Sequence, residues 1–313
     1  TGVFGIATKY GEALLAVKYR TVNLRGEIAG GPLYVLERGL GARWLGVLFA
    51  VFTAIAAFGI GNMTQATAIA EMLVVQAPAV PKWAVGLVLA TATAAVILGG
   101  IRSIARACEW LVPIMALAYV AGCAVLLLRS WETVPSTVSL IVSTAFTGQA
   151  ALGGFVGAGI REALGEWEAA LAAWRYGIAR GLFSNESGLG SAPIVAAAAR
   201  TENAVRQALV SATGTFWDTV VVCALTGLVL VGSGDWTEPG LTKASLCSAA
   251  FGRLPVLGTF VLTFGLLTFV FSTILGWAYY GEKAVEYLFG LAAVAVYRWL
   301  WVLAVFVGSV AQI

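Results

Sequence analysis

Long apolar runs separated by short polar segments form the pattern of this chain. A helix needs about 20 mostly apolar residues to cross a bilayer, so runs of this length predict membrane-spanning helices. The runs lie at about 44–79, 83–99, 109–128, 139–182, 207–231, 256–281 and 296–313. A shorter run at 1–17 precedes them, and Lys9 and Glu12 interrupt it. The pattern therefore predicts an all-α, polytopic membrane helical bundle.

The run at 139–182 differs from the others because glycines interrupt it at Gly153, Gly154, Gly157 and Gly159. Backbone polar groups freed by a helix break are costly in hydrocarbon, so such a break persists where it lines a cavity or a water-filled path. The spacing fits close packing of two helices equally well, since small residues let membrane helices approach. A discontinuous helix is thus one of two interpretations of these glycines.

Composition agrees with the membrane class and excludes several functions. Of 313 residues, 60% are hydrophobic and 11% charged, whereas a soluble domain has about 25% charged residues. The net charge of +3 is too small to indicate a nucleic-acid partner. The absence of histidine excludes His-ligated metal sites and Ser-His or Cys-His nucleophile pairs. The cysteines have no paired spacing and are interpreted as packing residues: Cys108, Cys123, Cys223 and Cys247.

The distribution of Lys and Arg predicts the orientation. If the run at 1–17 ends on the inner side, the outer loops hold only Lys82, Arg129, Lys243 and Arg253, and most other cations lie in inner loops. This is the asymmetry of the positive-inside rule.

Three connecting segments have predicted roles in this orientation. The inner segment 30–41 is expected to form a short amphipathic helix on the membrane face, with a plain connector as the alternative. The segment 100–112 is predicted to be a tight inner turn between two spans, with Arg102 and Arg106 at helical spacing. The outer segment 232–255 is a candidate cap for an outer vestibule.

Several sequence blocks carry a family resemblance. One is GLFSNESGLGSAPI at 181–194, and the others are GGPLYVLERGLG at 30–41, FGIGNMTQA at 58–66, VILGGIRSIAR at 96–106 and STILGWAYYGEKAVEYLFG at 272–290. In this order they resemble the alanine or glycine:cation symporter family, the sodium:alanine symporters. The resemblance extends from the first residues to about Arg298.

The resemblance implies the inverted-repeat amino-acid transporter fold with a discontinuous helix. It makes 1–313 a single transmembrane transporter domain. Residues 1–146 would be a first repeat that lacks its first helix, and 147–313 an incomplete second repeat. On this basis we expect the chain to be truncated at both ends.

The function implied by the resemblance is sodium-coupled secondary active symport of a small neutral amino acid, alanine or glycine, without enzymatic chemistry. The sodium ion is the coupled ion, and no further cofactor is implied. We expect a monomer that crosses the lipid bilayer of the cell (inner) membrane several times. A membrane-embedded enzyme that uses Ser184, Asn185 and Glu186 is the alternative from another class, and a non-transporting fragment is a third.

Candidate substrate residues come from the glycine break and two other runs. At a break near Gly153 and Gly154, the carbonyls of one half-helix favour an ammonium group and the amides of the other favour a carboxylate. Phe155 would form a wall against the substrate, or else face lipid. The resemblance places Gln65 at the substrate site. Its alternative role is an interhelical hydrogen bond, and the role of Asn62 stays open.

The candidate sodium site lies in the run 256–281. Ser272 and Thr273 are adjacent hydroxyls that, with the carbonyl of Phe269, could ligate sodium. The alternative is that the hydroxyls bond back to a carbonyl of the preceding turn. Trp277, one turn later, would close the pocket near Phe155 or serve as an ordinary packing aromatic.

Asp218 is an acidic residue within an apolar run, and such residues in membranes often mark functional sites. Pairing with a cation on a neighbouring helix is the equally weighted alternative. The Ser184 to Glu186 segment invites interpretation as a nucleophile, but without histidine it is better explained as a helix cap and gate.

Overall fold

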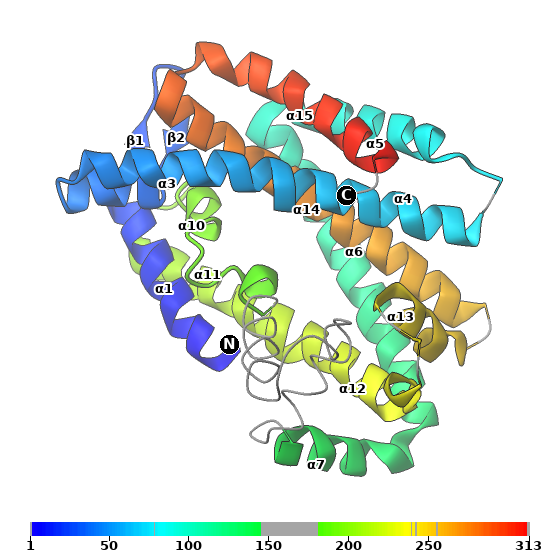
Figure 1. Cartoon of the computed structure of the whole chain (residues 1–313). Coiled ribbons are helices and arrows are strands. Elements are labelled where there is room, and N and C mark those ends of the chain that lie inside the picture. The colour runs from blue at the N-terminus through cyan, green and yellow to red at the C-terminus, as the bar shows by residue number, and fades with distance from the viewer. Residues whose placement is uncertain are drawn as a thin grey trace, which may run out of the picture. The chain divides into compact units, whose positions relative to one another are not determined.

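The computed structural model describes residues 2–77, 79–144, 181–238, 240–241, 243–254 and 256–311. Helices account for most of these residues (Figure 1), and the strands among them are limited to β1 (Thr21–Val22) and β2 (Ile28–Ala29). The all-α prediction is therefore confirmed. Five helices in the described part are long and apolar enough to cross a membrane: Arg43–Val74, Gly100–Arg129, Ala204–Ser233, Leu257–Phe289 and Ala292–Val310.

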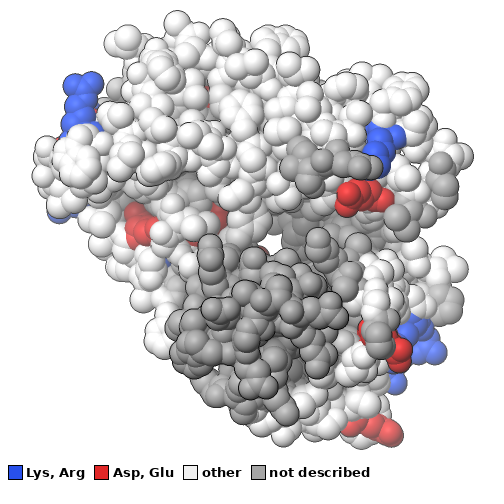
Figure 2. All heavy atoms as spheres, in the orientation of Figure 1, with Lys and Arg blue, Asp and Glu red and all other residues white. Residues whose placement is uncertain are grey.

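The surface of these helices is suited to lipid. In the space-filling view (Figure 2), uncharged side chains cover most of the visible described surface, and the charged side chains are few and mostly near its margins. Large apolar side chains face outward, among them Phe52, Val88, Leu117 and Leu128. Water would disfavour so much exposed apolar surface, whereas a bilayer accommodates it. The chain is thus a multi-pass membrane protein.

The larger of two compact units consists of Thr8–Met115, Gly188–Ala212 and Thr263–Ile313. Within it, three segments form one continuous helix: α3 (Arg43–Ala56), η2 (Ala57–Met63) and α4 (Thr64–Gln76). The last helix, α15 (Ala292–Val310), packs along both α4 and α5 (Lys82–Ile97).

Glycines allow this close packing around α15. A Cβ atom at Gly308 would lie 2.7 Å from the Cα atom of Met63, and one at Gly86 would lie 2.9 Å from the Cβ atom of Ser309. Real Cβ contacts under 3.0 Å essentially do not occur. The small residues therefore let α15 contact the backbone of its neighbours, as is usual for membrane helices.

The other unit consists of Thr1–Ala7, Ala116–Ser187 and Thr213–Leu262. In it, α12 (Ala224–Ser233) packs against α7 (Val134–Thr144) and α13 (Lys243–Gly252). Tyr119 hydrogen-bonds to Thr226 over 2.9 Å and stacks on Phe251 with ring centroids 5.8 Å apart. The remaining elements of the described chain are α1 (Gly2–Lys18), α2 (Pro32–Tyr34), η1 (Val35–Gly39), α6 (Gly100–Arg129), η3 (Trp131–Thr133), α10 (Ala192–Ala196), α11 (Ala204–Thr215), η4 (Phe216–Cys223), η5 (Asp235–Thr237) and α14 (Leu257–Phe289).

For the connecting segments, the structure confirms a short helix, whose position on the membrane face stays a prediction, and corrects a predicted turn. The predicted short helix at 30–41 is present as α2 and η1, between Gly31 and Gly41, which both have positive φ. The prediction of a tight turn over 100–112 is wrong, because α6 begins at Gly100 and continues to Arg129. The turn is confined to 98–99, and Gly100 adopts a φ of 69° that ends it. The polar residues at 100–112 are the first turns of a helix longer than a bilayer requires.

Candidate functional site

The described members of the candidate site lie on two elements of the larger unit. Gln65 is on α4, directly after η2, and the other residues, Phe269, Ser272, Thr273 and Trp277, are on α14. Gly153, Gly154 and Phe155, the predicted break and its wall, lie outside the described residues. The described part of the site therefore consists of α14 and the helix that contains η2.

The segment η2, Ala57–Met63, is a π-helix inside an otherwise α-helical rod. A π-helical turn contains an additional residue, and its backbone N–H groups bond to the carbonyl five residues earlier. Side chains add to these bonds. The Gly59 carbonyl accepts the backbone N–H of Thr64 and also Thr64 Oγ1, and Gln65 Nε2 donates to the Ile60 carbonyl, the two side-chain bonds each measuring 3.0 Å. π-helical turns within α-helices are frequent at functional sites. The sequence analysis missed this turn, and FGIGNM, with two glycines in an apolar run, was its available signal.

Trp277 packs directly against the η2 backbone. A Cβ atom at Gly61 would lie 2.7 Å from Cδ2 of Trp277 and still closer to its Cβ and Cγ atoms. The ring also meets Tyr280 edge-on, with centroids 5.5 Å apart and an interplanar angle of 70°. Trp277 is 6% exposed. The structure thus brings Trp277 onto the turn that precedes Gln65, and the predicted contact with Phe155 lies outside the described residues.

The three predicted sodium ligands converge on α14. Ser272 Oγ and Thr273 Oγ1 both donate to the carbonyl oxygen of Phe269, over 2.8 and 2.9 Å. This is the back-bonded arrangement that the sequence analysis gave as the alternative. It also gathers three oxygen atoms in one half-buried place, and sodium as a hard cation prefers oxygen ligands. Sodium binding at these residues stays a prediction.

The two amides of the η2 region have different environments. Asn62 is fully buried, and its Nδ2 donates to the Trp301 carbonyl of α15 over 3.0 Å. Gln65 is half-buried and bonds only within its own helix, and its Oε1 accepts no hydrogen bond from the described residues. The interhelical bond that we considered for Gln65 is therefore formed by Asn62 instead. The Oε1 atom of Gln65 is therefore an acceptor available to a ligand.

The segment 184–191 contains a helix end, and the residues after that end hydrogen-bond to α1. Gly188 and Gly190 have φ angles of 86° and 76°, a region in which glycine is favoured. Their N–H groups donate to the carboxylate of Glu12 in α1, over 3.2 and 3.1 Å. Glu12 was noted in the sequence only as an interruption of an apolar run, and its partner 176 residues away could not be identified from spacing.

In the smaller unit, Asp218 is bound by hydroxyl groups. Ser184 Oγ lies 2.8 and 3.1 Å from the two carboxylate oxygens, and Thr219 Oγ1 donates to one of them over 2.9 Å. No cation of the described residues forms an ion pair with Asp218, so the ion-pair alternative has no support in the described part. Asn185 adds a bond to Thr219 over 3.2 Å. Ser184 and Asn185 thus fasten a helix end to η4, in agreement with the cap interpretation.

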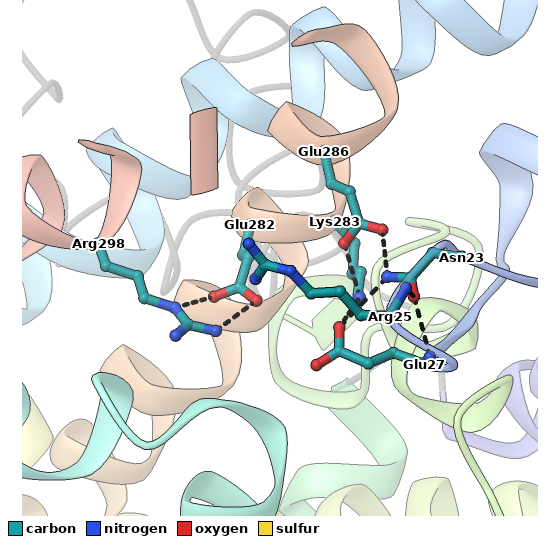
Figure 3. A network of polar contacts seen from close by, with 7 residues as sticks. All are labelled: Asn23, Arg25, Glu27, Glu282, Lys283, Glu286 and Arg298. Carbon is teal, nitrogen blue, oxygen red and sulfur yellow. Dashed lines mark hydrogen bonds and ion pairs between the residues drawn. The ribbon is translucent and has the colours of Figure 1, made fainter. Parts of the chain in front are cut away.

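A buried charge network occupies the end of α14 that follows Trp277 (Figure 3). Lys283 is 2% exposed and contacts Glu286 over 2.7 Å and Glu27 of the β1–β2 hairpin over 3.3 Å. Asn23 Nδ2 donates to Glu286 over 2.8 Å. Burial alone would raise the pKa of Glu27, but the charge of Lys283 and the Asn23 hydrogen bond outweigh it and lower the pKa. The hairpin is therefore held to α14 by charge.

The described residues contain no cluster of His, Cys, Asp and Glu that would hold a metal ion. All four cysteines are free. The oxygen atoms of Phe269, Ser272 and Thr273 suit an alkali cation rather than a transition metal.

Comparison with known proteins agrees with the membrane architecture. The model of the sodium:alanine symporter family matches residues 1–313. The sodium/alanine symporter AgcS of Methanococcus maripaludis is 48% identical over 100% of this chain and 67% of its own length. An uncharacterized transporter of Haemophilus influenzae is 46% identical over 98% and 66%, and the probable sodium/glutamine symporter GlnT of Bacillus subtilis is 32% identical over 91% and 57%. The chain spans about two thirds of the length of the first two relatives.

Proposed function

Because the chain belongs to the sodium:alanine symporter family, we propose that it carries out sodium-coupled symport of a small neutral amino acid, alanine or glycine. The observation that carries this proposal is the match over residues 1–313, together with the relative AgcS, which is named a sodium/alanine symporter and is 48% identical. The family and the relatives named above are transporters, and the protein is a multi-pass membrane protein. We place it in the cell (inner) membrane as a monomer.

The substrate site of this proposal combines the glycine break with the η2 region. Amides at Gly153 and Gly154 would receive the substrate carboxylate, since the N-terminal end of a half-helix favours an anion. The Oε1 atom of Gln65 would accept a hydrogen bond from the ammonium group. Phe155 and Trp277 would leave room for a substrate side chain no larger than a methyl group. The packing of Trp277 on Gly61 supports this, because a fixed ring gives a fixed pocket size.

The sodium site would use the carbonyl of Phe269 with the hydroxyls of Ser272 and Thr273. Three oxygens do not complete the shell of a sodium ion, and carbonyls of a second unwound helix would supply the rest, as in other inverted-repeat transporters. Sodium and substrate would bind one conformation more tightly and thereby shift an existing equilibrium between outward-open and inward-open states. The two inverted repeats, 1–146 and 147–313, would provide these states.

Uptake of labelled alanine by vesicles that contain the protein tests the proposed function. An inward sodium gradient should drive accumulation above equilibrium, and a sodium ionophore should abolish it. An enzyme at Ser184, Asn185 and Glu186 would instead release product without a gradient. Alanine uptake that is equal in sodium and potassium media would contradict the proposal.

Replacing Gln65 by leucine should weaken alanine binding by about 1–3 kcal/mol, because a buried polar partner of the substrate is lost. That loss corresponds to a dissociation constant about 5-fold to 150-fold higher. Gln207→Leu is the control, since Gln207 also bonds within its own helix, to Ser211 over 3.2 Å, but lies in α11. Binding isotherms measure both variants, and an unchanged affinity in Gln65→Leu would remove Gln65 from the site.

The double variant Ser272→Ala with Thr273→Val should raise the sodium concentration for half-maximal uptake by about tenfold or more. Each lost oxygen ligand weakens sodium binding, and a loss of about 1.4 kcal/mol corresponds to a tenfold change. Thr268→Val is the matched control, because Thr268 lies one turn before Ser272 on α14. Its Oγ1 also donates a hydrogen bond to a carbonyl of the preceding turn, that of Phe264, over 2.6 Å. Equal sodium dependence in the two variants would show that Ser272 and Thr273 serve only the helix.

A further inference from the structure

The ends of two spans enclose a cavity in the unit formed by Thr1–Ala7, Ala116–Ser187 and Thr213–Leu262. The cavity has a volume of about 210 Å³ and is lined by the last residues of α6 and α12 and by the residues that end α13. Arg129 is the last residue of α6 and Ser233 the last of α12. Because both apolar spans end here, the cavity lies at the level where hydrocarbon gives way to the lipid head groups.

Two guanidinium groups line this cavity. Arg253 Nη2 donates to the Ser233 carbonyl and forms an ion pair with Asp235 over 2.7 Å. Its side chain remains 53% exposed. Arg129 is also exposed, and it forms no ion pair with any described residue. Asp235 pairs with only one of the two arginines that line the cavity, so the lining has an excess of positive charge.

Apolar side chains also line the cavity. Leu127, Val229 and Leu254 contribute alkyl groups beside the two arginines. A cavity lined by both cations and alkyl groups fits an amphiphile with an anionic head. Drug-sized ligands occupy about 300–1,000 Å³, so a cavity of about 210 Å³ suits a head group and the first part of a chain.

We propose that this cavity binds the phosphate of an anionic phospholipid. Arg129 and Arg253 donate to the phosphate oxygens, because the planar guanidinium matches phosphate geometry. The glycerol and first methylene groups lie against Leu127 and Val229. An arginine at a helix C-terminus can also serve only to interact with the helix dipole or extend toward water. Neither role requires a second arginine from another element or an apolar wall.

Native mass spectrometry of the detergent-solubilised protein tests the site with added phosphatidylglycerol. Arg129→Gln should raise the dissociation constant for this lipid about tenfold, since one of two charged donors is lost. Arg102→Gln is the matched control, because Arg102 is exposed near the opposite end of the same helix. The control should bind as the unchanged protein does, and phosphatidylcholine, whose head group has no net charge, should bind all proteins more weakly.

Three outcomes would overturn the proposal. Equal phosphatidylglycerol affinity in Arg129→Gln and Arg102→Gln would show that Arg129 does not contact the lipid. Inorganic phosphate that binds as tightly as the lipid would identify a site for free anions. Alanine that displaces the lipid would identify a carboxylate site. In lipid-free detergent, the two variants should have unfolding temperatures within about one or two degrees of each other. This measurement separates the three outcomes from misfolding.

Discussion

Replacing Lys283 by methionine should lower the free energy of unfolding by about 3–5 kcal/mol. Methionine has a similar length but no charge, so Glu286 would remain buried at 6% exposure with Asn23 as its neutral partner. Removing one member of a buried ion pair leaves an uncompensated charge, and this is costlier than losing the attraction itself. Unfolding by a denaturing detergent in mixed micelles measures the change.

Two variants separate this effect from a general intolerance of substitution. Lys18→Met removes an exposed lysine from the end of α1 and should change the stability by less than about 0.5 kcal/mol. Adding Glu286→Leu to Lys283→Met removes both charges and should recover much of the loss. If Lys283→Met is as mild as Lys18→Met, the network of Figure 3 does not stabilise the contact between the hairpin and α14.

The class of fold was accessible from the sequence because hydrocarbon leaves few choices. Backbone groups in a bilayer must be bonded internally, so apolar runs of sufficient length become helices regardless of their neighbours. The runs at 44–79 and 296–313 correspond to the spans Arg43–Val74 and Ala292–Val310. The prediction of a turn at 100–112 was wrong because polar residues mark where a span leaves the hydrocarbon, but they do not mark where its helix ends.

The chemistry of individual side chains was less accessible. Asn62 and Gln65 are both amides in one apolar run, and composition cannot tell which of them faces another helix. The structure separates them, because Asn62 reaches the Trp301 carbonyl and Gln65 bonds to the Ile60 carbonyl of its own helix. Asn62 lies within the π-helical turn at 57–63 and Gln65 lies just after it, so the angle between the two side chains differs from that in a regular α-helix. A π-helix has nearly the same apolar composition as an α-helix, so only the two glycines of FGIGNM distinguish this stretch, and the run predicted a plain span.

Substituting alanine for Gly61 should abolish alanine transport in the protein while leaving its insertion into the membrane nearly unchanged. The new Cβ atom would overlap the side chain of Trp277, whose Cδ2 atom lies only 2.7 Å from that position. The overlap involves Cβ and Cγ of Trp277 as well, so a rotation of the ring cannot relieve it. The η2 segment and α14 must therefore separate, at a cost of about 1–3 kcal/mol. Trp277 and Gln65 would then be displaced relative to each other.

Gly59→Ala is the matched control for this result. Gly59 lies in the same π-helix, two residues earlier, and a Cβ atom there would meet no atom within 4 Å. Both substitutions change backbone flexibility in the same way, so only the contact with Trp277 distinguishes them. Gly59→Ala should transport alanine normally, whereas Gly61→Ala should not. Equal transport by the two variants, at equal amounts of protein in the membrane, would show that the position of Trp277 on η2 does not determine the substrate pocket.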